Sequence, residues 1–249
     1  MISQVKNPGS KLPFVLINMA MTADGKIATA NRAVHSFGSA RDHRHLYELR
    51  ATADAVMCGA RTVEISRSLM DVGGAPFRRL RLKHGLAEHP LRVIVSGSGS
   101  IDLNAPIFRQ RFPPIFPPII VLTTARISQI NRLKLQNLAV EVKLFGRTKI
   151  NFPAALRWLR TKWNVRRLLC EGGGELNEAM FQADLVDEIH LTICPKIFGG
   201  RAAPTIAEGG GLLSLAQAKK FELTSMCALD AELFTAFSRP NLRQKRQVF

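Results

Sequence analysis

The sequence predicts an α/β protein with a mostly parallel central sheet, helices on both of its faces and an antiparallel hairpin at its C-terminal end. Over most of the chain, short β-branched runs alternate with amphipathic stretches, and this alternation is typical of a parallel sheet. The pattern changes near the C-terminus, where residues 221–226 and 232–237 form two strand-like runs joined by a short turn. Such a pair is expected to close one edge of the sheet as a hairpin.

The first part of the chain holds two strand–helix units. Residues 14–20 form an apolar, strand-like run. Ser39 is a suitable N-cap for a helix that continues to about residue 53, because the apolar residues of this stretch recur at helical spacing. Residues 54–58 are then expected to form a second strand, and 60–65 the start of another helix.

The remaining elements continue the same alternation. We expect strands at 91–95, 119–123, 167–170 and 189–193, and a helix that Asn151 caps. The strands expected at 91–95 and 119–123 are separated by a loop rich in proline, with Pro106, Pro113, Pro114, Pro117 and Pro118. It could be a domain linker, but a surface excursion is favoured because the strand–helix rhythm resumes directly after it.

The composition is that of a globular protein. Hydrophobic residues make up 46% of the 249 residues and charged residues 22%, which excludes the disordered and fibrous classes. A chain of this length buries roughly 70–75% of the surface that it exposes when unfolded, so it needs neither disulfides nor metal to fold. We expect a flexible N-terminus at 1–11, a single domain at 12–238 and a basic tail at 239–249.

The chain is strongly basic, with a formal net charge of +16. Such a charge attracts nucleic-acid backbones, but it equally concentrates small phosphorylated substrates in a cleft. Two basic runs, at 78–83 and 239–246, are interpreted as solvated segments and not as binding patches.

The cysteines predict neither a zinc site nor a redox motif. They are far apart and lie in apolar segments, at Cys58, Cys170, Cys194 and Cys227. Four buried free thiols fit a reducing cytosol. No apolar run approaches the roughly 18 residues of a membrane-spanning helix, and the N-terminus lacks the apolar core of a signal peptide. The sequence therefore predicts a cytoplasmic protein with no membrane partner and no bound metal.

The most informative segment for function runs from residue 167 to 181. A buried strand ends at Glu171, glycines 172–174 form a turn, and a helix follows. Glycine lets the backbone approach a ligand closely, and the first N–H groups of a helix attract a diphosphate. The glycines follow neither the dinucleotide-binding nor the P-loop pattern, so a purely structural turn remains the alternative. Glu171 is placed where parallel strands meet their ligands, although a capping carboxylate would look the same.

Two further strand ends have similar turns. The first strand runs into Asp24-Gly25, which alone would indicate an ordinary hairpin turn. The second strand is followed by Gly59 and the start of a helix. Because the carboxyl ends of parallel strands meet at one edge of a sheet, the three turns predict a single ligand-binding edge.

Several motifs of the chain resemble those of a known family. The motifs are Thr22-x-Asp24-Gly25-Lys26-Ile27-Ala28, Leu49-Arg50-Ala51 before Asp54-Ala55-Val56, Gly59-x-x-Thr62-Val63, Glu171-Gly172-Gly173, Leu185-Val186-Asp187-Glu188 and Pro195-Lys196-Ile197-Phe198-Gly199-Gly200. Together, in this order and over residues 12–238, they resemble the pyrimidine reductases of riboflavin biosynthesis. The resemblance implies a dihydrofolate-reductase-like fold, a homodimer, NADPH as cofactor and a phosphorylated pyrimidine as substrate.

The implied reaction is reduction of the ribose of 5-amino-6-(5-phosphoribosylamino)uracil, or of its 2,5-diamino-pyrimidinone counterpart, to a ribityl chain. Carried over by position, the residues implied to bind cofactor are Thr62, Ser66, Gly97, Gly173, Gly174, Glu175 and Leu176. Those implied to bind substrate are Ser36, Arg50 and Glu171, with Arg50 suited to the substrate phosphate.

The chain departs from the family pattern at several positions. Ser66 replaces a common Asp, 34–38 replaces a Ser-x-Trp-Ile-Thr motif, and 69–74 lacks one expected phosphate-binding arginine. Arg78 or Arg79 could replace that arginine. No zinc-deaminase signature is present, so a deamination step would belong to another protein.

The expected chemistry is hydride transfer from C4 of NADPH to C1′ of the ring-opened ribose, with the protein supplying orientation and charge. The ionisable candidates for proton movement are Asp24, Lys26 and Glu171, and the sequence does not choose among them. We expect Glu171→Ala to reduce turnover and to leave the fold intact.

Two alternatives remain open. One is a related NADPH-dependent reductase that acts on a pterin or folate. The other is a basic nucleic-acid-binding protein, although one Tyr and two Trp provide few platforms for base stacking. The sequence also leaves open NADPH or NADH, with Arg126 or Arg61 as partners for a 2′-phosphate, and the uracil or the 2,5-diamino form of the substrate.

Overall fold

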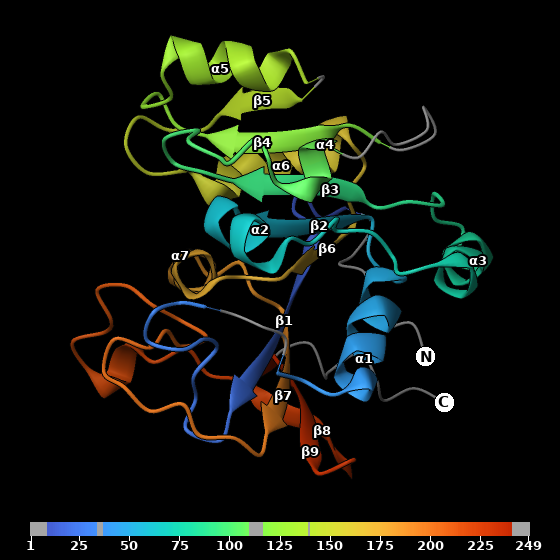
Figure 1. Cartoon of the computed structure of the whole chain (residues 1–249), viewed down its shortest axis with the longest axis vertical. Coiled ribbons are helices and arrows are strands. Elements are labelled where there is room, and N and C mark those ends of the chain that lie inside the picture. The colour runs from blue at the N-terminus through green and yellow to red at the C-terminus, as the bar shows by residue number, and fades with distance from the viewer. Residues whose placement is uncertain (1–8, 34–36, 110–116, 139, 241–249) are drawn as a thin grey trace.

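A nine-stranded sheet runs through the molecule in the order β5-β4-β3-β2-β6-β1-β7-β9-β8. Figure 1 shows the computed structural model, which describes residues 9–33, 37–109, 117–138 and 140–240. The strands are β1 Phe14–Thr22, β2 Ala55–Gly59, β3 Leu91–Val95, β4 Ile119–Thr123, β5 Glu141–Leu144, β6 Arg167–Cys170, β7 Glu188–Cys194, β8 Glu222–Leu229 and β9 Glu232–Ser238. Strands β1 to β7 pair in parallel, whereas β9 is antiparallel to β7 and β8 to β9. The predicted fold class is confirmed.

Helices cover both faces of the sheet. They are α1 Ala40–Arg50, α2 Ala60–Ser66, α3 Ala75–Lys83, α4 Pro106–Arg109, α5 Gln129–Gln136, α6 Phe152–Lys162 and α7 Gly174–Gln182, with a short 3-10 helix at Leu215–Gln217. Side chains on successive strand positions point to opposite faces. On β1, Val15 and Ile17 therefore pack with α6 and α7, and Phe14 and Leu16 pack with α1, α2, α4 and α5.

Helix α1 begins and ends close to where the sequence predicts. Ser39 is the N-cap, and its hydroxyl accepts hydrogen bonds from the N–H groups of Arg41 and Asp42. The helix ends at Arg50 instead of residue 53, because the chain turns through Ala51 before it enters β2.

The helices α3, α4 and α5, the strand β5 and the short 3-10 helix were not predicted. β5 is only partly buried, so it lacks the continuous apolar run by which the inner parallel strands are recognised. The predicted loop of prolines falls partly outside the described residues, at 110–116, and Pro106 begins α4.

Two expectations about polarity are wrong. Cys227 is exposed, unlike the other three cysteines, because it lies on the edge strand β8, most of whose residues are exposed. The basic run 78–83 is not wholly solvated, since Arg81 is only 1% exposed. At the C-terminal end, Arg239 donates hydrogen bonds to the carbonyls of Val186 and Asp184, so the described start of the basic tail is attached to the domain.

Arg81 holds the segment between α1 and β2 in place by hydrogen bonds to its backbone carbonyls. Its guanidinium donates to the carbonyl oxygens of Arg50, Ala53 and Ala87, and burial lowers its pKa to about 10. Leaving a buried carbonyl without a partner costs about 1–3 kcal/mol.

We therefore expect Arg81→Met to lower the free energy of unfolding by about 3 kcal/mol in urea denaturation. Arg79→Met, on the same helix but exposed, is the control and is expected to leave it unchanged. An unchanged midpoint in Arg81→Met would contradict this role.

Candidate active site

One large cleft opens at the carboxyl ends of β1, β2, β3 and β6. Its volume is about 1740 Å³, which exceeds the roughly 300–1,000 Å³ of a common small-ligand pocket. It is therefore large enough for a cofactor and a substrate together. Gly59 at the end of β2 and Glu171 with residues 173–176 after β6 line it. Two of the three predicted turns therefore meet at this edge, whereas Asp24-Gly25 is not among the lining residues.

The glycine turn after β6 is held in place by the neighbouring strand end. The N–H of Gly59 donates to the carbonyl of Gly172 at 2.8 Å. The N–H of Gly173 donates to the hydroxyl oxygen of Thr62 at 2.8 Å. Gly172 has φ +71°, and a Cβ there would lie 2.8 Å from the sulfur of Met19. Only glycine fits that conformation at so close an approach.

The first turn of α7 presents backbone N–H groups to the cleft. The N–H groups of Gly174, Glu175 and Leu176 have no partner within the helix, as is general for a first turn, and all three residues line the cleft. A Cβ on Gly174 would overlap the carbonyl of Thr205, and the N–H of Glu208 donates to the carbonyl of Gly174. This arrangement can hold a phosphate or diphosphate.

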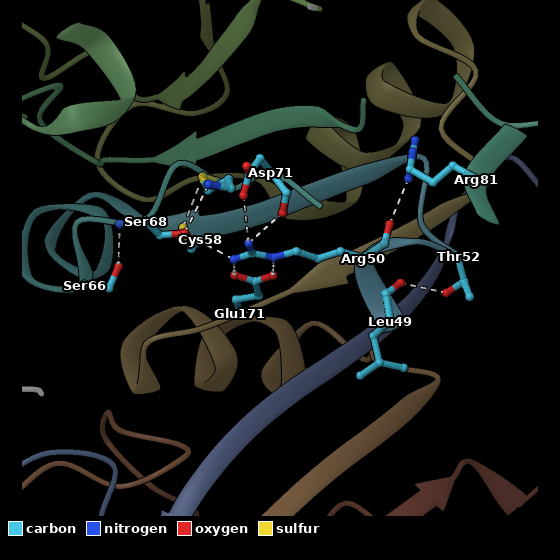
Figure 2. Close-up of polar contacts among 10 residues, drawn as sticks. Leu49, Arg50, Thr52, Cys58, Ser66, Ser68, Asp71, Arg81 and Glu171 are labelled. Atoms are coloured by element: carbon cyan, nitrogen blue, oxygen red, sulfur yellow. Dashed lines mark hydrogen bonds and ion pairs between the residues drawn. The ribbon is translucent and has the colours of Figure 1, made fainter. Parts of the chain in front are cut away.

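Arg50 and Glu171 form a bidentate ion pair in the wall of the cleft (Figure 2). Nε and Nη2 of Arg50 each donate to a carboxylate oxygen of Glu171 at 2.7 Å. The side chains are 5% and 12% exposed. Arg50 also donates to the carbonyl of Asp71 and to the hydroxyl of Ser68, so most of its N–H groups have partners.

The ion pair fixes the charge state of this part of the cleft. Burial alone would lower the pKa of Arg50, but the charge of Glu171 and its hydrogen bonds outweigh burial and raise that pKa. Both oxygens of Glu171 accept hydrogen bonds from a cation, which is the geometry of an ionised carboxylate. An ionised carboxylate only accepts hydrogen bonds, so Glu171 in this arrangement is not a proton donor. A substrate phosphate would reach Arg50 only by displacing Glu171 or Asp71.

Asp24 and Lys26 lie apart from this ion pair. The hydroxyl of Thr22 and the N–H groups of Gly199 and Phe198 donate to the carboxylate of Asp24 and lower its pKa. The ammonium of Lys26 donates to the carbonyl of Ala203. Among the described residues, neither lines the cleft. Their side chains stabilise the turn against the 196–205 loop.

The structure brings together most of the other predicted site residues. Thr62, Ser66, Gly97, Gly173, Gly174, Glu175 and Leu176 all line the cleft. Ser36 and its neighbours 34–35 lie outside the described residues. Arg61 lines the cleft beside Glu175, at 3.7 Å, whereas Arg126 does not. Arg78 pairs with Glu88 at 3.0 Å, and neither it nor Arg79 lines the described cleft.

Sequence analysis missed several lining residues. Thr148 and Lys149 reach the cleft from the segment between β5 and α6, and they were missed because β5 was not predicted. Asn18 and Asp42 also line it. A polar residue such as Asn18 within an otherwise apolar strand is a signal that could have found it.

In the described part of the chain, no cluster of His, Cys, Asp or Glu is arranged to hold a metal ion. Among the described helices, none is long and apolar enough to cross a membrane.

A parallel sheet that ends in a cleft lined by a glycine turn and a helix N-terminus is the arrangement with which many α/β proteins bind phosphorylated ligands. Among such proteins the comparison with known families is specific. The family model of the RibD C-terminal domain matches residues 13–235, and the chain belongs to this family.

Curated relatives cover nearly the whole chain. It is 32% identical over 210 residues to the 2,5-diamino-6-ribosylamino-4(3H)-pyrimidinone 5′-phosphate reductase of Archaeoglobus fulgidus, covering 84% of this chain and 93% of that protein. It is 30% identical over 226 residues to the protein of the same name from Methanothermobacter thermautotrophicus, covering 91% and 98%. These relatives are named as reductases.

Solved structures agree on the fold. The Acinetobacter baumannii RibD structure has a TM-score of 0.74 at 22% identity, over 92% of this chain and 58% of that one, so this chain spans only part of that longer protein. A pyrimidine reductase-like protein from Corynebacterium diphtheriae has a TM-score of 0.74 at 20% identity, with 91% of each chain covered. The expected dihydrofolate-reductase-like fold is confirmed.

Proposed function

We propose that this protein is an NADPH-dependent reductase that converts the ribose of a phosphoribosylamino pyrimidine to a ribityl chain. Family membership and the reductase names of the archaeal relatives support it. The observation that carries the proposal is that the open first turn of α7 and the Arg50–Glu171 pair lie in the wall of one cleft. Cofactor and substrate can therefore meet there.

The residues present fit a nicotinamide dinucleotide. The N–H groups of 174–176 would hold its diphosphate, and the Thr62 hydroxyl, which accepts from Gly173, still has its own proton to donate. Arg61 and Lys149 line the same cleft and supply positive charge for a 2′-phosphate, which favours NADPH over NADH. When bound, the cofactor supplies the hydride that reduces C1′ of the ribose.

The remaining part of the cleft would hold the substrate. Glu171 would accept hydrogen bonds from hydroxyl or amino groups, and Arg50 acts through it by fixing its orientation and charge. We therefore assign Arg50 as a positioning residue. The 2,5-diamino form is the proposed substrate, because the relatives whose length this chain matches are named for that form.

The proposal includes a homodimer and a cytoplasmic location. β8 is an edge strand, and its Met226 and Leu229 are exposed, at 64% and 42%. Exposed apolar edge strands favour pairing with a second chain. The buried free thiols of Cys58, Cys170 and Cys194 fit a reducing compartment.

A cofactor-oxidation assay tests the proposal. Each of the two phosphoribosylamino pyrimidines is offered with NADPH and with NADH, and loss of nicotinamide absorbance is followed. We expect the highest kcat/KM for the 2,5-diamino form with NADPH. Dihydrofolate and dihydropterin serve as comparison substrates. Turnover of either of them in place of both pyrimidines would overturn the proposal.

A further inference from the structure

Asp42 is the buried member of the carboxyl groups that line the described cleft. Asp42 lies in the first turn of α1, which stands beside β1 and β7 in Figure 1. The residue is only 8% exposed. A Cβ on Gly38 would overlap the Asp42 carboxyl group, so glycine at position 38 leaves the space in which this carboxyl sits.

The groups around Asp42 favour its protonated form. Burial raises the pKa of its carboxyl group, the Thr192 hydroxyl lowers it, the charge of Glu232 raises it and His43 lowers it, with a net rise. Glu232 on β9 accepts hydrogen bonds from the N–H and hydroxyl of Ser39. Cys194 on β7 donates to Glu232. Burial, this hydrogen bond and the charge of Glu232 raise the pKa of the thiol to about 12, with a smaller contribution from Asp42.

Asn18 provides an independent sign that a ligand binds here. It lies on β1, lines the cleft and is 8% exposed. Its Oδ1 is buried and has no hydrogen-bond partner in the part of the chain that the structure describes. A buried polar atom without a partner is costly, and a ligand hydroxyl or amino group would satisfy it. In the register of β1 with β7, Asn18 pairs with His190. Ala20, two residues further along β1, pairs with Thr192.

The two carboxyl groups stand at opposite ends of α1. Arg50, which holds Glu171, is the last residue of the helix, and Asp42 lies in its first turn. At about 1.5 Å of rise per residue, the Cα atoms of Asp42 and Arg50 are about 12 Å apart along the helix axis. A phosphorylated ribosylamine is long enough to extend over this distance. Glu64, Glu175, Glu178 and Glu208 also line the cleft, but they are exposed or only partly buried, whereas Asp42 is buried. Glu171 is held by Arg50. The burial of Asp42 therefore singles it out among the carboxyl groups of the described cleft.

We propose that Asp42 is the proton donor of the reduction, delivering its proton to the ring oxygen O4′ of the substrate ribose while Asn18 accepts a hydrogen bond from the substrate. This inference rests on the proposed function. It adds Asp42 to Asp24, Lys26 and Glu171, the candidates that the sequence predicts for proton movement.

The step balances in atoms and charge. The C1′–O4′ bond breaks, its electron pair stays on O4′, and O4′ takes the proton from Asp42. The amine nitrogen then forms a double bond to C1′ and becomes a cationic iminium, next to the new Asp42 carboxylate. Addition of the cofactor's hydride to C1′ gives the neutral ribitylamine and oxidised NADP⁺. Water reprotonates Asp42 after product leaves.

The pH dependence of kcat provides the first test. The active form has Asp42 protonated, so wild-type activity is lost as pH rises through the pKa of this group. We expect Asp42→Asn to lower kcat by about 10²–10⁴-fold, the usual contribution of a general acid, and to remove this alkaline limb. Glu232→Gln should move the limb to lower pH, because Glu232 raises the pKa of Asp42.

A second readout does not depend on turnover. In protein labelled with ¹³C at aspartate carboxyl groups, the resonance missing from folded Asp42→Asn identifies Asp42. We expect it to titrate above the ordinary aspartate value of 3.8, and to shift to lower pH in Glu232→Gln.

The outcomes separate the two proposals. If the wild type reduces neither pyrimidine, the proposed function fails and this inference with it. If the wild type is active but folded Asp42→Asn keeps its kcat and its alkaline limb, only the inference is overturned. An Asp42 resonance that titrates at or below the ordinary value would also overturn it.

Discussion

Gly173→Val is expected to abolish NADPH binding. A Cβ at position 173 would lie 3.3 Å from the hydroxyl oxygen of Thr62, closer than side chains normally pack, and valine adds two methyl groups beyond it. The hydrogen bond from Gly173 to Thr62 would be lost, and the first turn of α7 would move away from the diphosphate position. We expect the Kd for NADPH to rise at least about 100-fold, which corresponds to about 2.7 kcal/mol.

Fluorescence titration of NADPH against the purified variant measures this effect. Gly9→Ala is the matched control, because a Cβ at Gly9 has nothing within 4 Å and Gly9 does not line the cleft, and its Kd should equal that of the wild type. Equal affinity in Gly173→Val would mean that the turn does not hold the cofactor.

Glu171→Ala is expected to lose both turnover and stability. The sequence alone predicts an intact fold, but Glu171 is the partner of a guanidinium that is only 5% exposed. Removing one partner of a buried ion pair costs about 3–5 kcal/mol, because the other charge stays buried without compensation. Urea denaturation should show this loss, and kcat should fall because the substrate loses its acceptor.

Two further variants separate stability from activity. Glu171→Gln retains an oxygen that can accept from Arg50, so it should recover much of the stability while kcat stays low. The double variant Arg50→Met with Glu171→Leu removes both charges, and buried pairs are often replaced by apolar residues without loss of stability. It should fold well and remain inactive. Normal kinetics in Glu171→Ala or in the double variant would remove Glu171 from the site.

The sequence predicts most of the sheet because the inner strands are apolar on both faces. The run at 119–123, for example, is fully buried as β4. β5 was missed for the opposite reason, since its residues are only partly buried or exposed and carry a mixed polar pattern. The role of Arg81 was missed because a buried arginine in a basic run has the same local sequence as a solvated one.

The site was predicted in part. The glycine turn after β6 has a local signature, so it could be found from consecutive residues. The pairing of Arg50 with Glu171 joins residues 121 positions apart, and no spacing rule predicts it. Asp24 and Lys26 lie next to the right strand end in sequence, but their side chains bind the 196–205 loop. The short motif around Asp24 and Lys26 does not reveal whether their side chains point into the cleft or toward the loop.

The most direct test of the central claim follows the hydride itself. NADPH deuterated at C4 of the nicotinamide, in each of its two epimers, is turned over with the 2,5-diamino substrate, and the product is analysed by NMR. We predict that one epimer transfers its deuterium to C1′ of the ribityl chain and to no other carbon. Product that carries no deuterium from either epimer, or that carries it on the pyrimidine ring, would contradict the assignment of this cleft as a ribose-reducing site.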